Sequence, residues 1–162
     1  MAVDMFLELD GIKGETIDKT FKSKNAMDIL AWSWGLSNSG SFQQGSGGGA
    51  GKASFQDISI TKFIDLASPV LILACANGKH ITKGTITVRK AGENPLEYLK
   101  ITLEKILVSA YSTGGSGGEE RLTENVTLNF AKVKFEYQQQ DEKGGKGGSS
   151  DATWNIAENV KG

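Results

Sequence analysis

The sequence predicts a mainly β protein that is organised around one long hairpin. Two runs rich in Val, Ile, Leu, Thr, Phe and Tyr, namely Leu96–Ser112 and Arg121–Tyr137, flank the glycine cluster Thr113–Glu119. These residue types favour strands. A short glycine-rich segment between two such runs is typical of the turn between antiparallel strands.

Both runs of the hairpin alternate between apolar and polar residues, but the apolar phase changes within the second run. Val126, Leu128 and Phe130 occupy even positions, whereas the apolar residues that follow occupy odd ones, namely Ala131, Val133, Phe135 and Tyr137. Successive side chains of a strand point to opposite faces, so this change predicts a bulge or bend near Phe130–Ala131. In the first run the second face also becomes apolar from Ile106. Strands that switch their buried face suit a closed barrel or two wrapped sheets.

Further segments alternate in the same way and bring the predicted total to about seven strands. They are Val3–Leu9, Ala26–Leu36, Ala53–Ile64, Thr82–Lys90 and a closing strand that carries Ala152, Trp154, Ile156 and Val160. In the first strand the odd positions form the buried face, and Phe6 lies on the polar face. In Ala26–Leu36, Trp32 and Trp34 form the core face, and the small residues Ala31, Ser33 and Gly35 form the opposite face.

One short helix is predicted between the strands. Ser68 is a favoured N-cap residue, Pro69 suits the first helical position, and Asn77-Gly78 supplies a stop. The intervening segment Val70–Ala76 is short and mostly apolar, so we expect the helix to be buried on most sides.

Three polar segments connect these elements. Gly11–Lys24 reads as a connecting loop, and Ser37–Lys52 is a long glycine-rich loop of a kind that tends to be functional or disordered. Asp141–Ser150 has the composition of a flexible linker.

The length and charge of the chain limit the classes of protein to which it could belong. Its 162 residues suit one domain, spanning 1–162. A formal net charge of −1, with no block of like charge, argues against nucleic acid or an anionic membrane as a main partner. No apolar run approaches the roughly 20 residues that span a bilayer. The single cysteine cannot form an internal disulfide, and no usual signal peptide is visible, so we expect synthesis in the cytoplasm.

No motif in the sequence supports catalysis or a bound cofactor. The segment Gly47–Lys52 resembles a phosphate loop, but Ser46 replaces the first glycine and the segment that follows alternates like a strand. His80 is the sole histidine and has no spaced nucleophile or base, so a histidine in a turn is the simpler interpretation. Cys75 reads as a small core residue within the helix, and no metal-ligand spacing is present.

Several segments taken together resemble the haemolysin-coregulated protein (Hcp) family. In chain order they are the opening MAVDMFLELDGIKGE, Leu30–Gly35, Gly51-Lys52 before Gln56–Lys62, Ser68-Pro69, Cys75–His80, Arg89–Gly92, Glu97–Leu99 and Ser112–Gly118 leading into Leu122–Phe130. Their number and order cover nearly the whole chain, and the departures lie in Gly14–Asn25 and Gln138–Ser150.

The resemblance implies a single β-barrel of two antiparallel sheets with one short α-helix, which assembles into a hexameric ring. It also implies that such rings stack into the tube of a bacterial type VI secretion system and are secreted through that apparatus without a signal peptide. The expected partners are further copies of the chain, effector proteins in the central channel, and the sheath, spike and baseplate proteins.

The resemblance further implies two sets of site residues. Ser33, and with it Ala31, would face the channel and contact effectors. The loop 37–52 would contact the neighbouring ring through Phe42, Gln43, Gln44, Gly48 and Lys52. Two other classes remain open, namely a monomeric or dimeric β-barrel adaptor and a small enzyme that uses His80 or surface Asp and Glu residues. The oligomeric state distinguishes an adaptor from a ring.

Overall fold

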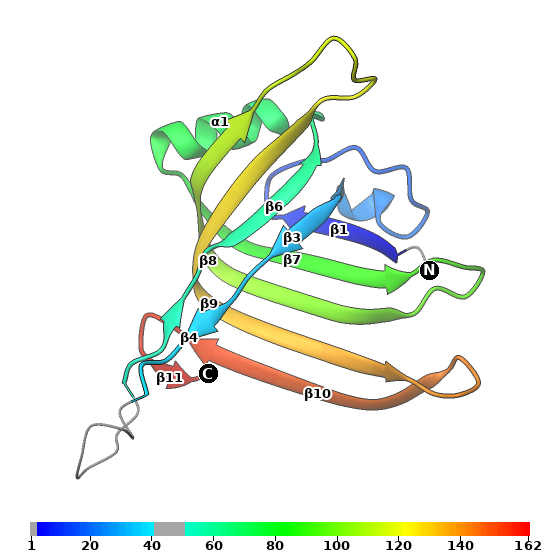
Figure 1. Ribbon diagram of the computed structural model, residues 1–162, viewed down its shortest axis with the longest axis vertical. Helices are drawn as coiled ribbons and strands as arrows, with labels where there is room; N and C mark the ends of the chain where they lie inside the picture. Colours follow the sequence, from blue (N-terminus) through cyan, green and yellow to red (C-terminus); the bar gives the residue numbers. More distant parts are fainter. Residues whose placement is uncertain (1–2, 41–50) are drawn as a thin grey trace.

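The computed structural model of the protein describes residues 3–40 and 51–162. Within them, eleven strands, one α-helix and one 3-10 helix follow one another along the chain (Figure 1). In order they are β1 (Val3–Leu9), η1 (Lys22–Lys24), β2 (Met27–Asp28), β3 (Ala31–Ser33), β4 (Leu36–Ser37), β5 (Ser54–Phe55), β6 (Ile58–Phe63), α1 (Ser68–Asn77), β7 (His80–Lys90), β8 (Glu97–Thr113), β9 (Thr123–Gln140), β10 (Lys146–Asn155) and β11 (Val160–Lys161). The prediction of a mainly β protein with one short α-helix is confirmed.

Nine of the strands form one antiparallel sheet that divides into two arms (Figure 1). The lower arm has the order β11-β10-β9-β8-β7-β1-β2. The upper arm has the order β3-β6-β9-β8 and uses residues 123–130 of β9 and 106–113 of β8. The long hairpin β8–β9 therefore belongs to both arms. β4 and β5 pair separately with each other.

The hydrophobic core lies between the two arms and against α1. Its most buried side chains include Ile60 and Leu128 from the upper arm, Leu7 and Ile101 from the lower arm, and Leu71 from α1. The expected closed barrel is wrong for a single chain. Among the described residues the lower arm ends at β2 and β11 and the upper arm ends at β3, and none of these three strands pairs with another of them. The arms diverge because β8 and β9 bend from one arm into the other, so their outer strands do not meet.

The bend in the hairpin coincides with a change of buried face in both strands. In β8 the buried positions change from Ile101 and Leu103 to Ile106 and Val108, and in β9 they change from Phe130 to Val133. The buried face changes near Phe130–Ala131 as the alternation predicts, but the irregularity in the β8–β9 pairing lies between Val108 and Ala110 and not at the predicted position. Between the two phases Lys105 has a φ of 54°, in the left-handed region that L-residues rarely adopt.

Two strands that the sequence predicted as continuous are interrupted in the structure. Ala26–Leu36 divides into β2, β3 and β4, which pair with β1, β6 and β5 respectively. Ala53–Ile64 divides into β5 and β6. Each break occurs where the chain leaves one partner strand for another. Leu30 and Leu36 are exposed as a result, whereas Trp32 and Trp34 pack against the core as predicted.

Helix α1 begins and ends where the sequence predicted, but its burial differs. Gly78 has a φ of 68° and ends the helix. Ser68 is the first helical residue, and Ala67 is the N-cap. Asp65, two residues before Ala67, accepts a hydrogen bond from the Ala67 amide at 2.9 Å. The expectation of burial on most sides is wrong. Leu71 and Ala74 face the core, while the outward side of the helix is exposed because a single chain offers one sheet surface for packing.

The predicted linker Asp141–Ser150 is a tight turn followed by the start of β10, so the expectation is wrong for residues 146–150. The amide of Asp141 donates to the carbonyl of Gly145 at 2.8 Å, and the amide of Gly144 donates to the carbonyl of Asp141 at 3.1 Å. Pairing with β9 supplies the hydrogen bonds that composition alone could not predict.

The segment Gly11–Lys24 covers the outer side of β1, so Phe6 is buried, although the alternation of β1 predicts that it lies on a polar face. The Phe6 and Phe21 rings stack with centroids 4.1 Å apart, and the Arg89 guanidinium lies 4.9 Å from the Phe6 ring. Arg89 also forms an ion pair with Asp18. Burial acts to raise the pKa of Asp18, but hydrogen bonds from Arg89 and from the amides of Phe21 and Thr20 outweigh it and lower that pKa.

Because the pKa of Asp18 is lower in the folded state, its ion pair stabilises the fold above the unfolded pKa of about 4. That contribution is lost as the pH falls through the folded pKa. We expect Asp18→Asn to reduce the free energy of unfolding at pH 7 by about 1 to 3 kcal/mol. The difference from the wild type should shrink in urea titrations below about pH 4. An equal difference at pH 7 and pH 3 would contradict this assignment.

Candidate functional site

The side of the upper arm that faces away from the core carries small, uncharged side chains. Pairing across the four strands places them in two rows, because directly opposite residues share a face. The first row is Ser33, Ser59, Thr127 and Ala110, and the second is Ala31, Thr61, Asn125 and Ser112. The Thr61 hydroxyl donates to the Asn125 side-chain oxygen at 2.8 Å. We call these eight residues the neutral face.

The predicted residues Ser33 and Ala31 are both exposed on this face, at its β3 edge. Sequence reasoning missed the other six members, which come from β6, β8 and β9. The sequence does indicate that these side chains are exposed, because in β6 and β9 hydroxyl and amide residues alternate with buried residues such as Ile60 and Val126. The sequence does not show which strands pair, so it does not show that these residues share one face.

The carboxylate of Asp57 borders the neutral face. Asp57, just before β6, accepts hydrogen bonds from the Ser109 hydroxyl at 2.7 Å and from the Asn129 side-chain amide at 2.9 Å. Both oxygens of Asp57 are thus held by neutral donors from β8 and β9. These two hydrogen bonds connect the start of β6 to the β8–β9 hairpin and hold the Asp57 carboxylate at the border of the neutral face.

The two outer strands of the upper arm each have a free edge. Within residues 3–40 and 51–162, β3 pairs on one side alone, with β6. In the same part of the chain, residues 108–113 of β8 pair on one side alone, with β9, because β7 begins at His80 opposite Leu107. Unpaired strand edges are templates for pairing with another chain.

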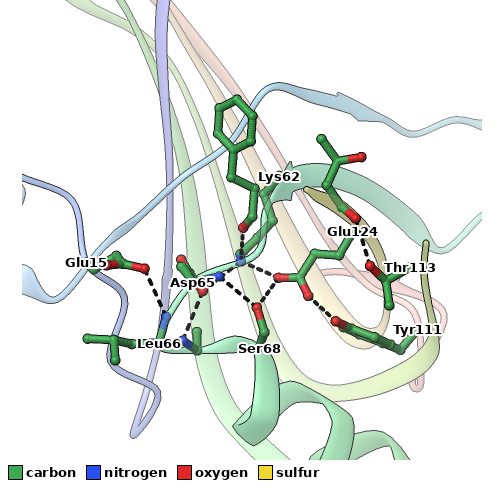
Figure 2. A network of polar contacts seen from close by, with 11 residues as sticks. Glu15, Lys62, Asp65, Leu66, Ser68, Tyr111, Thr113 and Glu124 are labelled. Atoms are coloured by element: carbon green, nitrogen blue, oxygen red, sulfur yellow. Dashed lines mark hydrogen bonds and ion pairs between the residues drawn. The ribbon is translucent and has the colours of Figure 1, made fainter. Parts of the chain in front are cut away.

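Behind the neutral face lies a buried ionic cluster (Figure 2). Lys62 and Glu124 are directly opposite in the β6–β9 pairing, and both side chains are completely buried. The Lys62 ammonium bonds to Glu124, to Asp65 at 2.8 Å and to the Phe63 carbonyl at 2.9 Å. All three donors of the ammonium are satisfied.

Glu124 accepts two further hydrogen bonds, which join α1 and β8 to the cluster (Figure 2). One comes from the Ser68 hydroxyl at 2.7 Å, and the other comes from the Tyr111 hydroxyl. Burial and the neighbouring Glu124 carboxylate raise the pKa of Tyr111 to about 12, so it remains a donor. Two carboxylates surround one ammonium, and one of them, Asp65, also accepts from the amide of Ala67 at the start of α1.

The predicted stacking residues Phe42, Gln43, Gln44 and Gly48 lie outside the described residues. Lys52 is exposed. The two ends of the loop are held together, because the Asn38 side-chain amide donates to the Gly51 carbonyl at 2.7 Å. The β4–β5 pair lies immediately before and after them.

An apolar groove of about 450 Å³ lies between the β4–β5 pair and the β9–β10 hairpin. It is lined mainly by aromatic and aliphatic side chains, including Trp34, Phe55, Phe135 and Trp154. Trp34 and Trp154 are half-buried. Each packs against the core and also lines the groove.

The two titratable residues singled out in the sequence lie on different elements. His80 is exposed at the first position of β7, and Cys75 is half-buried in α1. Among residues 3–40 and 51–162, no three His, Cys, Asp or Glu side chains lie together as a potential metal site. No helix in that part of the chain is long and apolar enough to cross a membrane.

The family described as "Type VI secretion system effector, Hcp" matches residues 6–137. The chain belongs to the Hcp family. It is 56% identical to Protein hcp1 of Pseudomonas aeruginosa over 163 residues, which is 99% of each chain. The resemblance predicted from the sequence is therefore confirmed.

Solved Hcp structures share the fold of this Hcp-family chain. Hcp1 from Salmonella typhimurium is 40% identical, with a TM-score of 0.81 and 99% of both chains covered. A structure described as a type six secretion system protein has a TM-score of 0.92 at 27% identity and covers 99% of this chain and 100% of its own. Hcp proteins are tube subunits that are secreted through the type VI apparatus, and this chain is one of them.

Replacing Lys62 alone should strongly destabilise the fold, because it leaves two buried carboxylates without their cation. We expect Lys62→Met to lower the free energy of unfolding by about 3 to 5 kcal/mol. Adding Glu124→Gln should recover part of that loss, because glutamine still accepts from Ser68 and Tyr111 without a charge.

Urea unfolding followed by tryptophan fluorescence, at one protein concentration, measures these differences. The matched control is Lys132→Met, because Lys132 is partly exposed and lies 3.7 Å from Glu104. It should change stability by about 1 kcal/mol or less. A Lys62→Met variant as stable as this control would show that the buried cluster is not ionic in the way described.

Proposed function

We propose that six copies of this chain close into a ring, that rings stack into a tube, and that the neutral face lines the channel and contacts effectors. The observation that carries the proposal is the pair of free edges on opposite sides of the upper arm. A ring with more than two subunits uses two different surfaces of each copy. The β3 edge of one copy and the 108–113 edge of the next would supply them.

The position of the rest of the chain relative to the upper arm supports a neutral face that points into the channel. The opposite side of the upper arm is covered by the core, the lower arm and α1 (Figure 1). If six upper arms joined edge to edge, the core, the lower arm and α1 of each chain would lie on the outside of the ring, where the circumference is larger. Ser33, Ala31 and the rest of the neutral face would then line the inner wall.

The role we propose is structural, with no reaction catalysed by the chain. The Hcp family is a family of structural secreted proteins, and its tube role requires surfaces rather than reactive groups. We further propose that the outer surface, built from the lower arm, contacts the sheath, and that the two ends of the tube contact the spike and baseplate.

The native mass of the purified protein tests the ring. Six chains of 17.3 kDa form a particle of about 104 kDa, and electron micrographs of the same sample should show closed rings. A monodisperse monomer would overturn the ring and favour an adaptor with the same fold.

A substitution at Ser33 tests the channel assignment. We expect Ser33→Arg to leave rings intact and to reduce effector retention, because a long charged side chain would occupy the space of a small hydroxyl. Co-purification of a secreted effector measures retention. Lys100→Arg, a conservative change at an exposed position of the lower arm, should have no effect. Unchanged retention in the Ser33 variant would show that Ser33 does not contact the effector.

Truncation of the loop tests the stacking assignment. Deleting residues 41–49 should weaken ring stacking and spare the hexamer, because the proposed contacts to the next ring lie in this loop. Sedimentation of tubes and native mass measure the two properties separately. Tubes that form as readily as those of the full chain would contradict the assignment.

A further inference from the structure

The outward side of α1 carries exposed apolar side chains. Leu66 and Leu73 are 63% and 64% exposed, and Ile72 and Val70 are 45% and 38% exposed. The helix contains no charged residue. We call Leu66, Val70, Ile72 and Leu73 the α1 patch.

A surface helix of a globular protein normally presents polar residues to water, and a helix that is apolar all round is normally buried. In the single chain α1 buries Leu71 and Ala74 but leaves its other side open. The lower arm shows the usual surface pattern, with charged residues such as Lys132 and Glu136 on its outer side. The α1 patch is therefore built for contact with a further apolar surface.

The position of α1 indicates which surface covers the patch. The helix packs against β8, and Glu124 ties its first turn to Tyr111, within the free edge of β8. The patch thus adjoins the edge that would receive the neighbouring copy in a ring. A strand added to that edge would bring its own core-side residues alongside α1.

The complementary residue is Leu30, next to the other free edge. Leu30 lies directly before β3, where the chain bends, and its amide donates to the Thr61 carbonyl of β6 at 2.8 Å. Its side chain is 44% exposed. If upper arms joined edge to edge, Leu30 of one copy would lie beside the β8 edge of the next copy, against which α1 packs.

We infer that the α1 patch of one copy packs against Leu30 of the adjacent copy, so that the ring is held by an apolar contact behind the joined strand edges. This inference rests on the proposed ring. The occupant is a second copy of the chain, and the contact pairs two different surfaces, as a closed ring requires. The buried Lys62 cluster holds α1 in place relative to the β8 edge, which keeps the patch in register with the neighbour.

Charge substitution at the patch tests the contact in the full-length protein. Leu73→Glu and Leu30→Glu should each remain folded by circular dichroism, because both positions are exposed. Each should weaken ring assembly roughly tenfold or more, because the new carboxylate would be buried without a partner. Leu73→Met keeps an apolar side chain and should assemble like the wild type. Ile17→Glu places the same charge at another exposed apolar residue and should also assemble.

Thiol cross-linking tests which two surfaces meet. In a Cys75→Ser background, a chain with both Leu30→Cys and Leu73→Cys should form a ladder up to the hexamer with a short bis-maleimide reagent. Either cysteine alone should give no ladder, because the contact joins unlike positions.

The outcomes separate this inference from the ring itself. If the wild type is a monomer, the proposed ring fails. If the wild type is a ring, but Leu73→Glu assembles equally well and the double-cysteine chain forms no ladder, the ring stands and the α1 contact is overturned.

Discussion

The β8–β9 hairpin changes its buried face between the Glu104–Lys132 pair and the Ile106–Phe130 pair, and the rest of the architecture depends on this change. A straight hairpin with one apolar face would have built a single sheet with one core side. Because both strands switch face together, the same hairpin serves two arms that enclose the core from different sides. The left-handed conformation of Lys105 is the local backbone cost of that bend. The bend also leaves free the two edges by which a second copy can be added.

The Lys62–Glu124 pair is the second constraint, because it connects four elements at one buried point. Replacing a buried ion pair by apolar residues is often neutral for stability, so its value to a protein can lie in conformational specificity. Here the pair joins β6 to β9 directly, and Glu124 adds α1 through Ser68 and β8 through Tyr111. An apolar cluster could fill the same space without fixing the helix relative to the free edge of β8.

If the neutral face lines the channel as we propose, the contrast between the two arms gives a physical basis for the passage of different proteins. The lower arm has charged residues on its outer side, where opposite charges pair, as Glu104 and Lys132 do. The neutral face has none, and its border carboxylate Asp57 is held by two neutral donors. A wall of hydroxyl, amide and methyl groups forms weak hydrogen bonds without selecting one sign of charge. Long-range electrostatics would neither repel nor trap a passing protein on such a surface.

The sequence by itself determined the strand-rich class, the long hairpin, its change of face and the limits of α1, because alternation, Ser68-Pro69 and Gly78 act through local geometry. It also placed Ser33 and Ala31 on a small-residue face. Tertiary structure alone decided the burial of Lys62 and Glu124, because two strand-end charges become a core pair when β6 and β9 bring residues 62 and 124 opposite each other. It likewise decided the division of Ala26–Leu36, the burial of Phe6 and the open edges. Each of these depends on which distant segment lies alongside, and a local pattern carries no information about that partner.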